Sequence, residues 1–245
     1  MTLAHQFAAY TEWRSRLSAN IGEFKGWLSA NELSDAQTDL RLSQLLERLR
    51  EDRLNVAFVA EFSRGKSELI NAIFFADYGN RILPSSAGRT TMCPTELLYD
   101  AAKSPRIELL PIQTRAANTS VSEYKRFPEE WFLVPLDVDS ADVMQEGLRH
   151  VSETLRVTPD EAARLGFSVG ERASDLYRAG DDGLVEVPRW RHALINFPHP
   201  LLKQGLVILD TPGLNAIGAE PELTVSLIPQ AHAVVFILGA DTGVT

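Results

Sequence analysis

The stretch AEFSRGKSELINAIF, residues 60–74, follows the apolar run LNVAFV and contains the sequence Gly65-Lys66-Ser67. A strand, a glycine-bearing loop and a helix in this order form an anion site, because the N–H groups at the helix start and the helix dipole both favour phosphate. The pattern G-x-x-x-x-G-K-[ST] assigns Lys66 to the β- and γ-phosphates and the Ser67 hydroxyl to Mg²⁺. The sequence therefore predicts a nucleotide-binding loop at this point.

The first position of this pattern is occupied by Ala60, where the pattern has glycine. That glycine acts mainly on the backbone, at the turn from strand to loop. Alanine is acceptable there if φ stays negative, and it costs about 1 kcal/mol or somewhat more if φ must be positive. This cost is small beside the interaction of a triphosphate and Mg²⁺ with the loop, so the prediction stands.

A second motif lies at LVILDTPGL, residues 206–214, where an apolar strand ends in Asp210. A carboxylate at this point can face phosphate-bound Mg²⁺, usually through water, and the Gly213 N–H can reach the γ-phosphate. An ordinary D-T-P-G turn is the alternative. Because both this motif and the G-K-S sequence follow apolar strands, a shared nucleotide site is the better interpretation.

A third motif lies between the first two, in the polar loop of ILPSSAGRTTMCPTEL, residues 82–97. In switch GTPases a threonine of such a loop gives its hydroxyl to Mg²⁺ and its N–H to the γ-phosphate, and the loop is ordered only while that phosphate is bound. Thr90 and Thr91 are the two candidates. An ordinary pair of loop threonines is the alternative.

The composition of the 245-residue chain is ordinary for a globular protein, with 44% hydrophobic and 23% charged residues. The net charge of -9 argues against a nucleic-acid partner. Cys93 is the single cysteine, so neither an intrachain disulfide nor a cysteine-built zinc site can form. The start has no pattern of a secretory signal, and no apolar run approaches the roughly 18 residues of a membrane span. We therefore expect a cytoplasmic protein.

Residues 3–53 predict two helices. The first has an apolar stripe at alternating steps of four and three, interrupted by Arg14 and formed by Leu3, Phe7, Tyr10, Leu17, Ile21, Phe24 and Leu28. The second begins with a capping box of Ser34 and Gln37, and its stripe consists of Leu42, Leu45, Leu46 and Leu49. These helices either cover each other or the next domain, or they form half of a helical bundle whose other helices lie elsewhere.

From residue 54 onward, predicted strands alternate with predicted helices, which is typical of an α/β sheet. The expected strands are 55–60, 95–100, 106–112, 187–197, 206–210 and 232–240, and the expected helices are 66–75, 140–156 and a short one that opens at Thr158. The helix over 140–156 rests on the inward-facing series Val143, Gly147, Val151 and Leu155. Residues 113–185 carry the fewest clear signals.

With these three motifs, residues 54–245 resemble the GTPase domain of the dynamin superfamily, especially of its bacterial members. The likeness rests on FSRGKSELINAIF, ILPSSAGRTTMCPTEL and LVILDTPGLN, and on a separation between the two switches far larger than in small Ras-like domains. It implies a P-loop NTPase α/β fold, a three-layer sandwich with a central, mostly parallel sheet. It also implies that residues 1–53 are a bundle-forming helical segment ahead of a GTPase domain over 54–245.

The resemblance implies roles for individual residues. Thr91, three residues before Pro94, is the better match for the switch threonine, with Thr90 as the competitor. Ser63 matches a position that helps to hold a charge-compensating cation or to stabilise transition-state charge, and Arg64 either does a related task or faces solvent or an ion-pair partner. The predicted nucleotide-binding residues are Glu61, Phe62, Ser63, Arg64, Gly65, Lys66, Ser67, Glu68, Thr91, Asp210 and Gly213. Among them, the catalytic candidates are Ser63, Arg64 and Thr91. The predicted Mg²⁺ ligands are Ser67, Thr91 and Asp210.

Two departures from the family pattern bear on function. Phe62 stands where eukaryotic dynamins have a glutamine that orients the attacking water, a feature often shared by bacterial relatives. No [NT]-K-x-D sequence, the motif that reads guanine, follows residue 240. We therefore expect a C-terminally incomplete GTPase domain, and the preference for guanine comes from the resemblance alone.

The expected function is that of a dynamin-like GTPase, which binds and hydrolyses GTP to GDP with Mg²⁺, switches conformation and dimerises through its nucleotide face. The alternative is a nucleotide-responsive assembly or scaffold module with negligible hydrolysis. A P-loop ATPase or nucleotide kinase is a third hypothesis, which the D-T-P-G motif and the threonine loop disfavour. Any contact with a membrane would be peripheral and made through regions outside this chain.

Overall fold

The computed structural model describes residues 3–50, 53–60, 65–79, 82–83, 93–117, 119–167, 180–211 and 228–238. Backbone contacts divide the chain into two units, Met1–Leu54 and Asn55–Thr245. In the described part of the chain, no helix has both the length and the apolar character that crossing a membrane requires.

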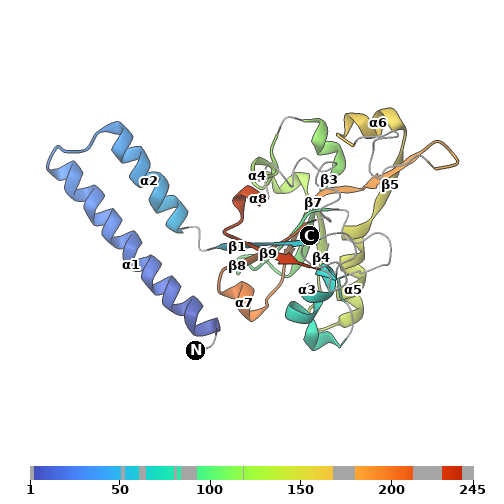
Figure 1. The fold of residues 1–245 in the computed structure, drawn as a ribbon, viewed down its shortest axis with the longest axis horizontal. Coiled ribbons are helices and arrows are strands. Elements are labelled where there is room, and N and C mark those ends of the chain that lie inside the picture. Colours follow the sequence, from blue (N-terminus) through green and yellow to red (C-terminus); the bar gives the residue numbers. More distant parts are fainter. Residues whose placement is uncertain are drawn as a thin grey trace. The chain divides into compact units, whose positions relative to one another are not determined.

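The first unit is a helical hairpin of α1 (Leu3–Ala30) and α2 (Ala36–Arg50), as Figure 1 shows. Lys25 of α1 joins the two helices, because its ammonium group donates to Ser43 Oγ at 2.7 Å and lies 3.2 Å from the Asp39 carboxylate. The cap of α2 lies one residue after the predicted Ser34: the Asp35 carboxylate accepts from the Thr38 N–H at 2.8 Å. The predicted capping box of Ser34 was therefore wrong by one position.

The apolar stripe predicted for α1 is only partly buried. Leu28 is buried, whereas Tyr10 and Phe24 are about half exposed. Each of these two rings stacks on a tryptophan three residues later, Trp13 and Trp27, which are also exposed. The aromatic face of α1 is thus open within the unit.

The second unit is built on a seven-stranded sheet with the strand order β4-β3-β7-β2-β8-β1-β9. Its strands are β1 (Leu54–Ala60), β2 (Thr95–Leu98), β3 (Arg106–Pro111), β4 (Phe132–Pro135), β7 (Trp190–Asn196), β8 (Leu206–Asp210) and β9 (Ala233–Ile237). The sheet is mixed: β1 pairs with β9 and β2 with β7 in parallel, while β2 pairs antiparallel with β8, and β3 with both β4 and β7.

Helices cover both faces of this sheet. In Figure 1, α4 (Val121–Tyr124) and α8 (Ile228–Gln230) lie on one side, and α3 (Lys66–Phe74), α5 (Ala141–Arg149) and α7 (Pro200–Lys203) on the other. Alternating residues of the central strands form a buried layer that consists of Ala57, Val59, Leu98, Val207 and Leu209. The predicted three-layer α/β architecture is confirmed.

A smaller sheet of β5 (Thr154–Val157) and β6 (Val185–Pro188) lies in the segment between β4 and β7 in the sequence. Together with α6 (Pro159–Arg164) it encloses its own core, which consists of Ile112, Val157, Ala162, Leu165, Phe167, Val185 and Val187. The predicted start of α6 is confirmed, because Thr158 Oγ1 accepts from the Glu161 N–H at 3.3 Å.

Two predictions in this segment were wrong. The helix expected over 140–156 ends at Arg149 and gives way to a 3₁₀ turn, η4 (His150–Ser152), and then to β5. The single strand expected over 187–197 is interrupted at Arg189, which separates β6 from β7. The remaining 3₁₀ helices are η1 (Ala76–Tyr78), η2 (Ile112–Ala116) and η3 (Pro128–Glu130).

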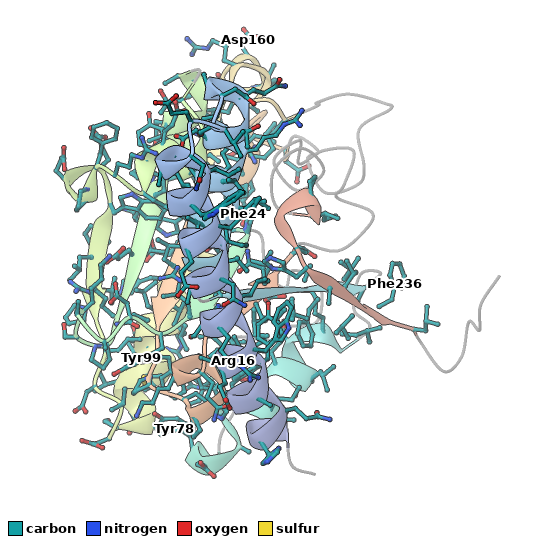
Figure 2. The ribbon with its side chains drawn as sticks, turned by 90° about the vertical axis from the view of Figure 1, so that its left-hand side faces the viewer. Arg16, Phe24, Tyr78, Tyr99, Asp160 and Phe236 are labelled. Carbon is teal, nitrogen blue, oxygen red and sulfur yellow. The ribbon has the colours of Figure 1, made fainter. Side chains whose placement is uncertain are left out.

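The last strand, β9, is the outermost strand beside β1 and is largely exposed. Among the described strands it pairs with β1 alone. Its apolar side chains Val234, Val235 and Phe236 are 49%, 36% and 56% exposed. Figure 2 shows Phe236 well away from the central strands of the sheet. This edge therefore exposes apolar side chains.

Candidate nucleotide site

The structure describes the two residues that flank the predicted phosphate-binding loop, Ala60 and Gly65. Ala60, the last residue of β1, is fully buried, and Gly65 stands at the N-cap of α3. Gly65 has φ = 82°, in the left-handed region that favours glycine. An added Cβ would meet no atom within 4 Å, so it is backbone conformation rather than space that requires glycine here.

Lys66 and Ser67 are the first two residues of α3, and both are buried. The N–H groups of the first turn of a helix have no partner within the helix and carry the positive end of its dipole. Glu68, which follows them, is partly buried. The predicted phosphate-binding residues Lys66 and Ser67 thus begin a helix at the carboxyl end of a buried strand.

The second motif meets the first at this place. The Lys66 ammonium group contacts Asp210 Oδ1, although the two residues are 144 positions apart in the sequence. Asp210 is the last residue of β8, and both side chains are more than 90% buried. Charges this deeply buried need a compensating partner, which each supplies to the other.

The ends of three neighbouring strands fix the position of Asp210. Its backbone lies opposite Thr95 of β2 in the antiparallel register, and the Thr95 hydroxyl donates to the Cys93 carbonyl at 3.1 Å. On the other side, the hydroxyl of Thr211 donates to the Phe58 carbonyl of β1 at 2.9 Å. Asp210 is therefore held between β2 and β1.

Asn71 attaches the beginning of the third motif to the same helix. The Asn71 amide is buried in α3, donates to the Leu83 carbonyl at 3.1 Å and accepts from the Leu83 N–H at 2.8 Å. Leu83 precedes the segment that contains Thr90 and Thr91. One side chain thus satisfies both backbone groups of a residue outside regular structure.

The opposite face of the sheet holds a buried charged group that the sequence reasoning missed. Glu96 of β2 accepts from Lys125 Nζ at 2.7 and 2.8 Å, and its Oε1 lies 2.9 Å from His192 Nε2 of β7. Burial raises the pKa of Glu96, but the hydrogen bonds and charges of His192 and Lys125 outweigh it and lower the pKa to about 2. The one sign of this group in the sequence was a glutamate within the predicted strand that contains TELL.

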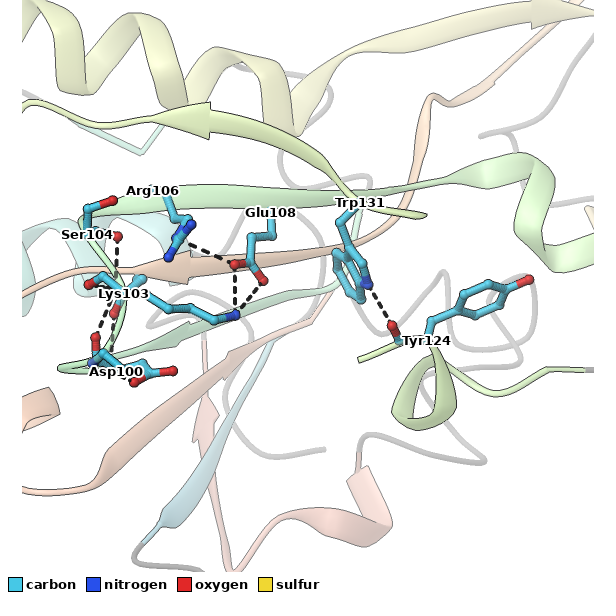
Figure 3. Close-up of polar contacts among 9 residues, drawn as sticks. Asp100, Lys103, Ser104, Arg106, Glu108, Tyr124 and Trp131 are labelled. Atoms are coloured by element: carbon cyan, nitrogen blue, oxygen red, sulfur yellow. Dashed lines mark hydrogen bonds and ion pairs between the residues drawn. The ribbon is translucent and has the colours of Figure 1, made fainter. Parts of the chain in front are cut away.

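The segment that carries Lys125 is itself fixed by Trp131, whose indole N–H donates to the Tyr124 carbonyl at 2.9 Å (Figure 3). The same view shows Lys103 donating to both carboxylate oxygens of Glu108, at 2.9 and 3.2 Å, beside Arg106. These contacts stabilise the β2–β3 side of the sheet and lie outside the predicted nucleotide-binding set.

The structure describes five of the predicted site residues, namely Gly65, Lys66, Ser67, Glu68 and Asp210. It places Lys66 and Asp210 in contact and Ser67 next to Lys66. Glu61, Phe62, Ser63, Arg64, Thr90, Thr91 and Gly213 lie outside the described residues, so their roles stay predictions. The Ser67 hydroxyl and the Asp210 carboxylate are hard oxygen donors of the kind that Mg²⁺ prefers, so the residues present fit this ion.

Residues 56–245 match the family model of the Dynamin family. Over 222 residues, or 91% of this chain, the sequence is 22% identical to the bacterial dynamin-like protein of Nostoc punctiforme and covers 25% of that protein. It is 36% identical to the isoniazid-induced protein IniA of Mycobacterium tuberculosis over 86 residues, which are 34% of this chain and 13% of IniA. The chain thus spans about a quarter of the first relative and less of the second.

Two solved structures of an oligomerised bacterial dynamin pair, described as sensing and tethering membranes over long range, are also similar to this chain. One is 19% identical with a TM-score of 0.41 and covers 82% of this chain and 23% of its own. The other is 17% identical with a TM-score of 0.41 and covers 94% and 28%. Since the family model matches most of the sequence, this chain belongs to the dynamin family.

Proposed function

We propose that this chain binds GTP together with Mg²⁺ and hydrolyses it to GDP, as a GTPase of dynamin type. The observation that carries the proposal is the buried contact between Lys66 and Asp210 at the start of α3. The two motifs that a GTPase uses for phosphate and for Mg²⁺ meet there, although they are distant in the sequence. Membership of the dynamin family supports guanine nucleotide as the ligand.

In this proposal, the Lys66 ammonium group leaves Asp210 and binds the β- and γ-phosphates, assisted by the N–H groups at the start of α3. The Ser67 hydroxyl and the Asp210 carboxylate hold Mg²⁺, which neutralises charge on the phosphates when it is bound. Thr91, or Thr90 in its place, and Gly213 complete the contacts to the γ-phosphate. Ser63 and Arg64 stabilise the charge that develops during hydrolysis.

The proposal extends to self-association and location. Two chains would face each other across the nucleotide, which would stimulate hydrolysis, and the protein would act in the cytoplasm, at the periphery of a membrane. The solved dynamin pair is described as oligomerised and as tethering membranes. Contact with membrane by this protein would use segments beyond the quarter of the Nostoc relative that this chain matches.

A second candidate function is a nucleotide-responsive assembly module that binds GTP and hydrolyses it negligibly. Phe62 favours this candidate, because an aromatic ring cannot orient the attacking water as a glutamine would. The two candidates share the phosphate site and differ in turnover.

Binding and turnover separate these hypotheses. Fluorescent GTP and ATP analogues are titrated with and without Mg²⁺, and phosphate release is then measured over a range of protein concentrations. GTP binding with a specific activity that rises with concentration supports the dimerising GTPase. GTP binding with background phosphate release at every concentration supports the assembly module, and preference for ATP rejects both.

A further inference from the structure

Thr211 joins two strands that carry the phosphate and metal motifs. It follows Asp210 directly, is 2% exposed, and its Oγ1 donates to the Phe58 carbonyl at 2.9 Å. The two partners are 153 positions apart in the sequence. Phe58 lies in β1, two residues before Ala60, where the chain leaves the strand for the phosphate-binding loop.

The Thr211 hydroxyl reaches a carbonyl of β1 just beyond the end of β8, which is Asp210. A buried backbone carbonyl requires a hydrogen-bond partner. The Thr211 side chain supplies it, while the backbone of Asp210 remains paired with Thr95 of β2 on the other side. The residue that carries the carboxylate is therefore attached to both neighbouring strands, once through its own backbone and once through the next side chain.

We propose that Thr211 is a positioning residue that fixes the Asp210 carboxylate relative to the phosphate-binding loop. The proposal rests on the proposed function, in which Asp210 holds Mg²⁺. A metal-binding carboxylate must be held within a fraction of an ångström by its supporting shell. Loss of a side chain that orients a metal ligand typically lowers metal affinity about 10- to 100-fold.

The test separates the hydroxyl from the shape of the side chain. Thr211→Val keeps the branched shape and removes the hydroxyl, and Thr211→Ser keeps the hydroxyl. A non-hydrolysable fluorescent GTP analogue is titrated in Mg²⁺ and in EDTA, and the ratio of the two affinities measures the Mg²⁺ enhancement. We expect this enhancement to fall about tenfold in Thr211→Val, with EDTA affinity unchanged, and to be retained in Thr211→Ser.

Thr114→Val is the matched control, because the Thr114 hydroxyl also donates to a backbone carbonyl, that of Pro111 at 2.7 Å, away from the site. It should bind as the wild type does. Amide hydrogen exchange of the ligand-free chain gives a readout that needs no metal: exchange over residues 206–211 should be faster in Thr211→Val and not in Thr114→Val. Thr211→Ala replaces the valine variant if that variant does not fold.

An unchanged Mg²⁺ enhancement in Thr211→Val overturns the positioning role. Equal losses in Mg²⁺ and in EDTA also overturn it, since they indicate a general structural role. If the wild-type chain binds the analogue without any Mg²⁺ enhancement, the proposed function itself is contradicted. The wild-type titration alone gives this result.

Discussion

Two buried groups of charged side chains lie on opposite faces of the same sheet. They are next to two successive residues of β2, Thr95 and Glu96. Thr95 is opposite Asp210, which contacts Lys66, whereas the next residue, Glu96, points to the other face toward His192 and Lys125. The Lys66–Asp210 pair stands where a strand ends and a helix begins. The Glu96 group lies within the sheet, where the carboxylate accepts from Lys125 and contacts the His192 ring.

The difference lies in what else each group can bind. At the start of α3 the helix N–H groups provide a second source of positive charge, so phosphate can take the place of Asp210 beside Lys66. Glu96 has Lys125 and His192 as hydrogen-bond partners and is followed by two more residues of β2. Burial of charge alone therefore does not distinguish the two groups; the proposed phosphate site is the one that stands at the end of a strand and the start of a helix.

The largest expected effect is that of Lys66→Ala on nucleotide binding. Removal of the ammonium group takes away the main phosphate cation and leaves Asp210 buried with its charge less compensated, so we expect affinity for labelled GTP to fall about a hundredfold or more. Lys103→Ala removes a lysine that pairs with Glu108 outside the site and serves as the control. Wild-type affinity in Lys66→Ala would refute the site assignment. The Lys66–Asp210 pair would then be a structural ion pair, as the Glu96 group is.

Acid should reveal the Glu96 group through stability rather than binding. The pKa of Glu96 is lowered to about 2, below the ordinary value of 4.5, so its contribution is complete above pH 4.5 and is lost as the pH falls toward 2. The free energy of unfolding should lose about 3 kcal/mol over this range through Glu96. Denaturant unfolding at pH 7, 4.5 and 3 should show a smaller loss in Glu96→Gln, and equal losses in both proteins would contradict this origin.

Gly65→Ala tests the backbone at the phosphate site without touching a charge. Because Gly65 has φ = 82°, alanine should cost about 1–2 kcal/mol in unfolding free energy. Gly26→Ala is the matched control, since Gly26 lies inside α1 with no atom within 4 Å of an added Cβ, and alanine there should stabilise by about 0.5–1 kcal/mol. Equal thermal shifts in the two variants would show that the left-handed turn carries no strain.

The effect of Asp210→Asn on affinity in EDTA should be the smallest of these changes, and it should have an unusual sign. Without Mg²⁺, phosphate must displace the Asp210 carboxylate from Lys66 and face its negative charge, so the asparagine variant should bind labelled GTP about fivefold more tightly in EDTA. The same variant should lose most of the Mg²⁺ enhancement. Weaker binding in EDTA would mean that Asp210 does not compete with phosphate for Lys66.

The meeting of Lys66 and Asp210 could be predicted from the sequence because both residues follow apolar strands at fixed positions of their motifs. Gly65, Lys66 and Asp210 need only their local motifs and the rule that strand ends meet at one edge of a sheet. Glu96 and His192 belong to no motif. Their contact depends on the parallel register of β2 and β7, which no local pattern contains.

The predicted ends of helices and strands were wrong where contacts with a distant segment determine where the element ends. Apolar residues continue at helical spacing beyond Arg149, yet the chain leaves the helix, because the His150 carbonyl accepts from the Trp190 indole at 2.7 Å and the Glu153 carbonyl from the Arg189 N–H at 2.9 Å. Both bonds satisfy carbonyls with donors from a distant segment. The split of the strand expected over 187–197 at Arg189 has the same cause.

The exposed edge at β9 has a practical consequence for measurements in solution. A strand that pairs on one side only among the described strands, with Val234, Val235 and Phe236 exposed, is a template for edge-to-edge aggregation, which grows with protein concentration whether or not nucleotide is present. Light scattering and concentration-dependent turnover would both respond to it. Phe236→Lys places a charge on that edge. It would distinguish edge-to-edge aggregation from association across the nucleotide, since only the aggregation should disappear.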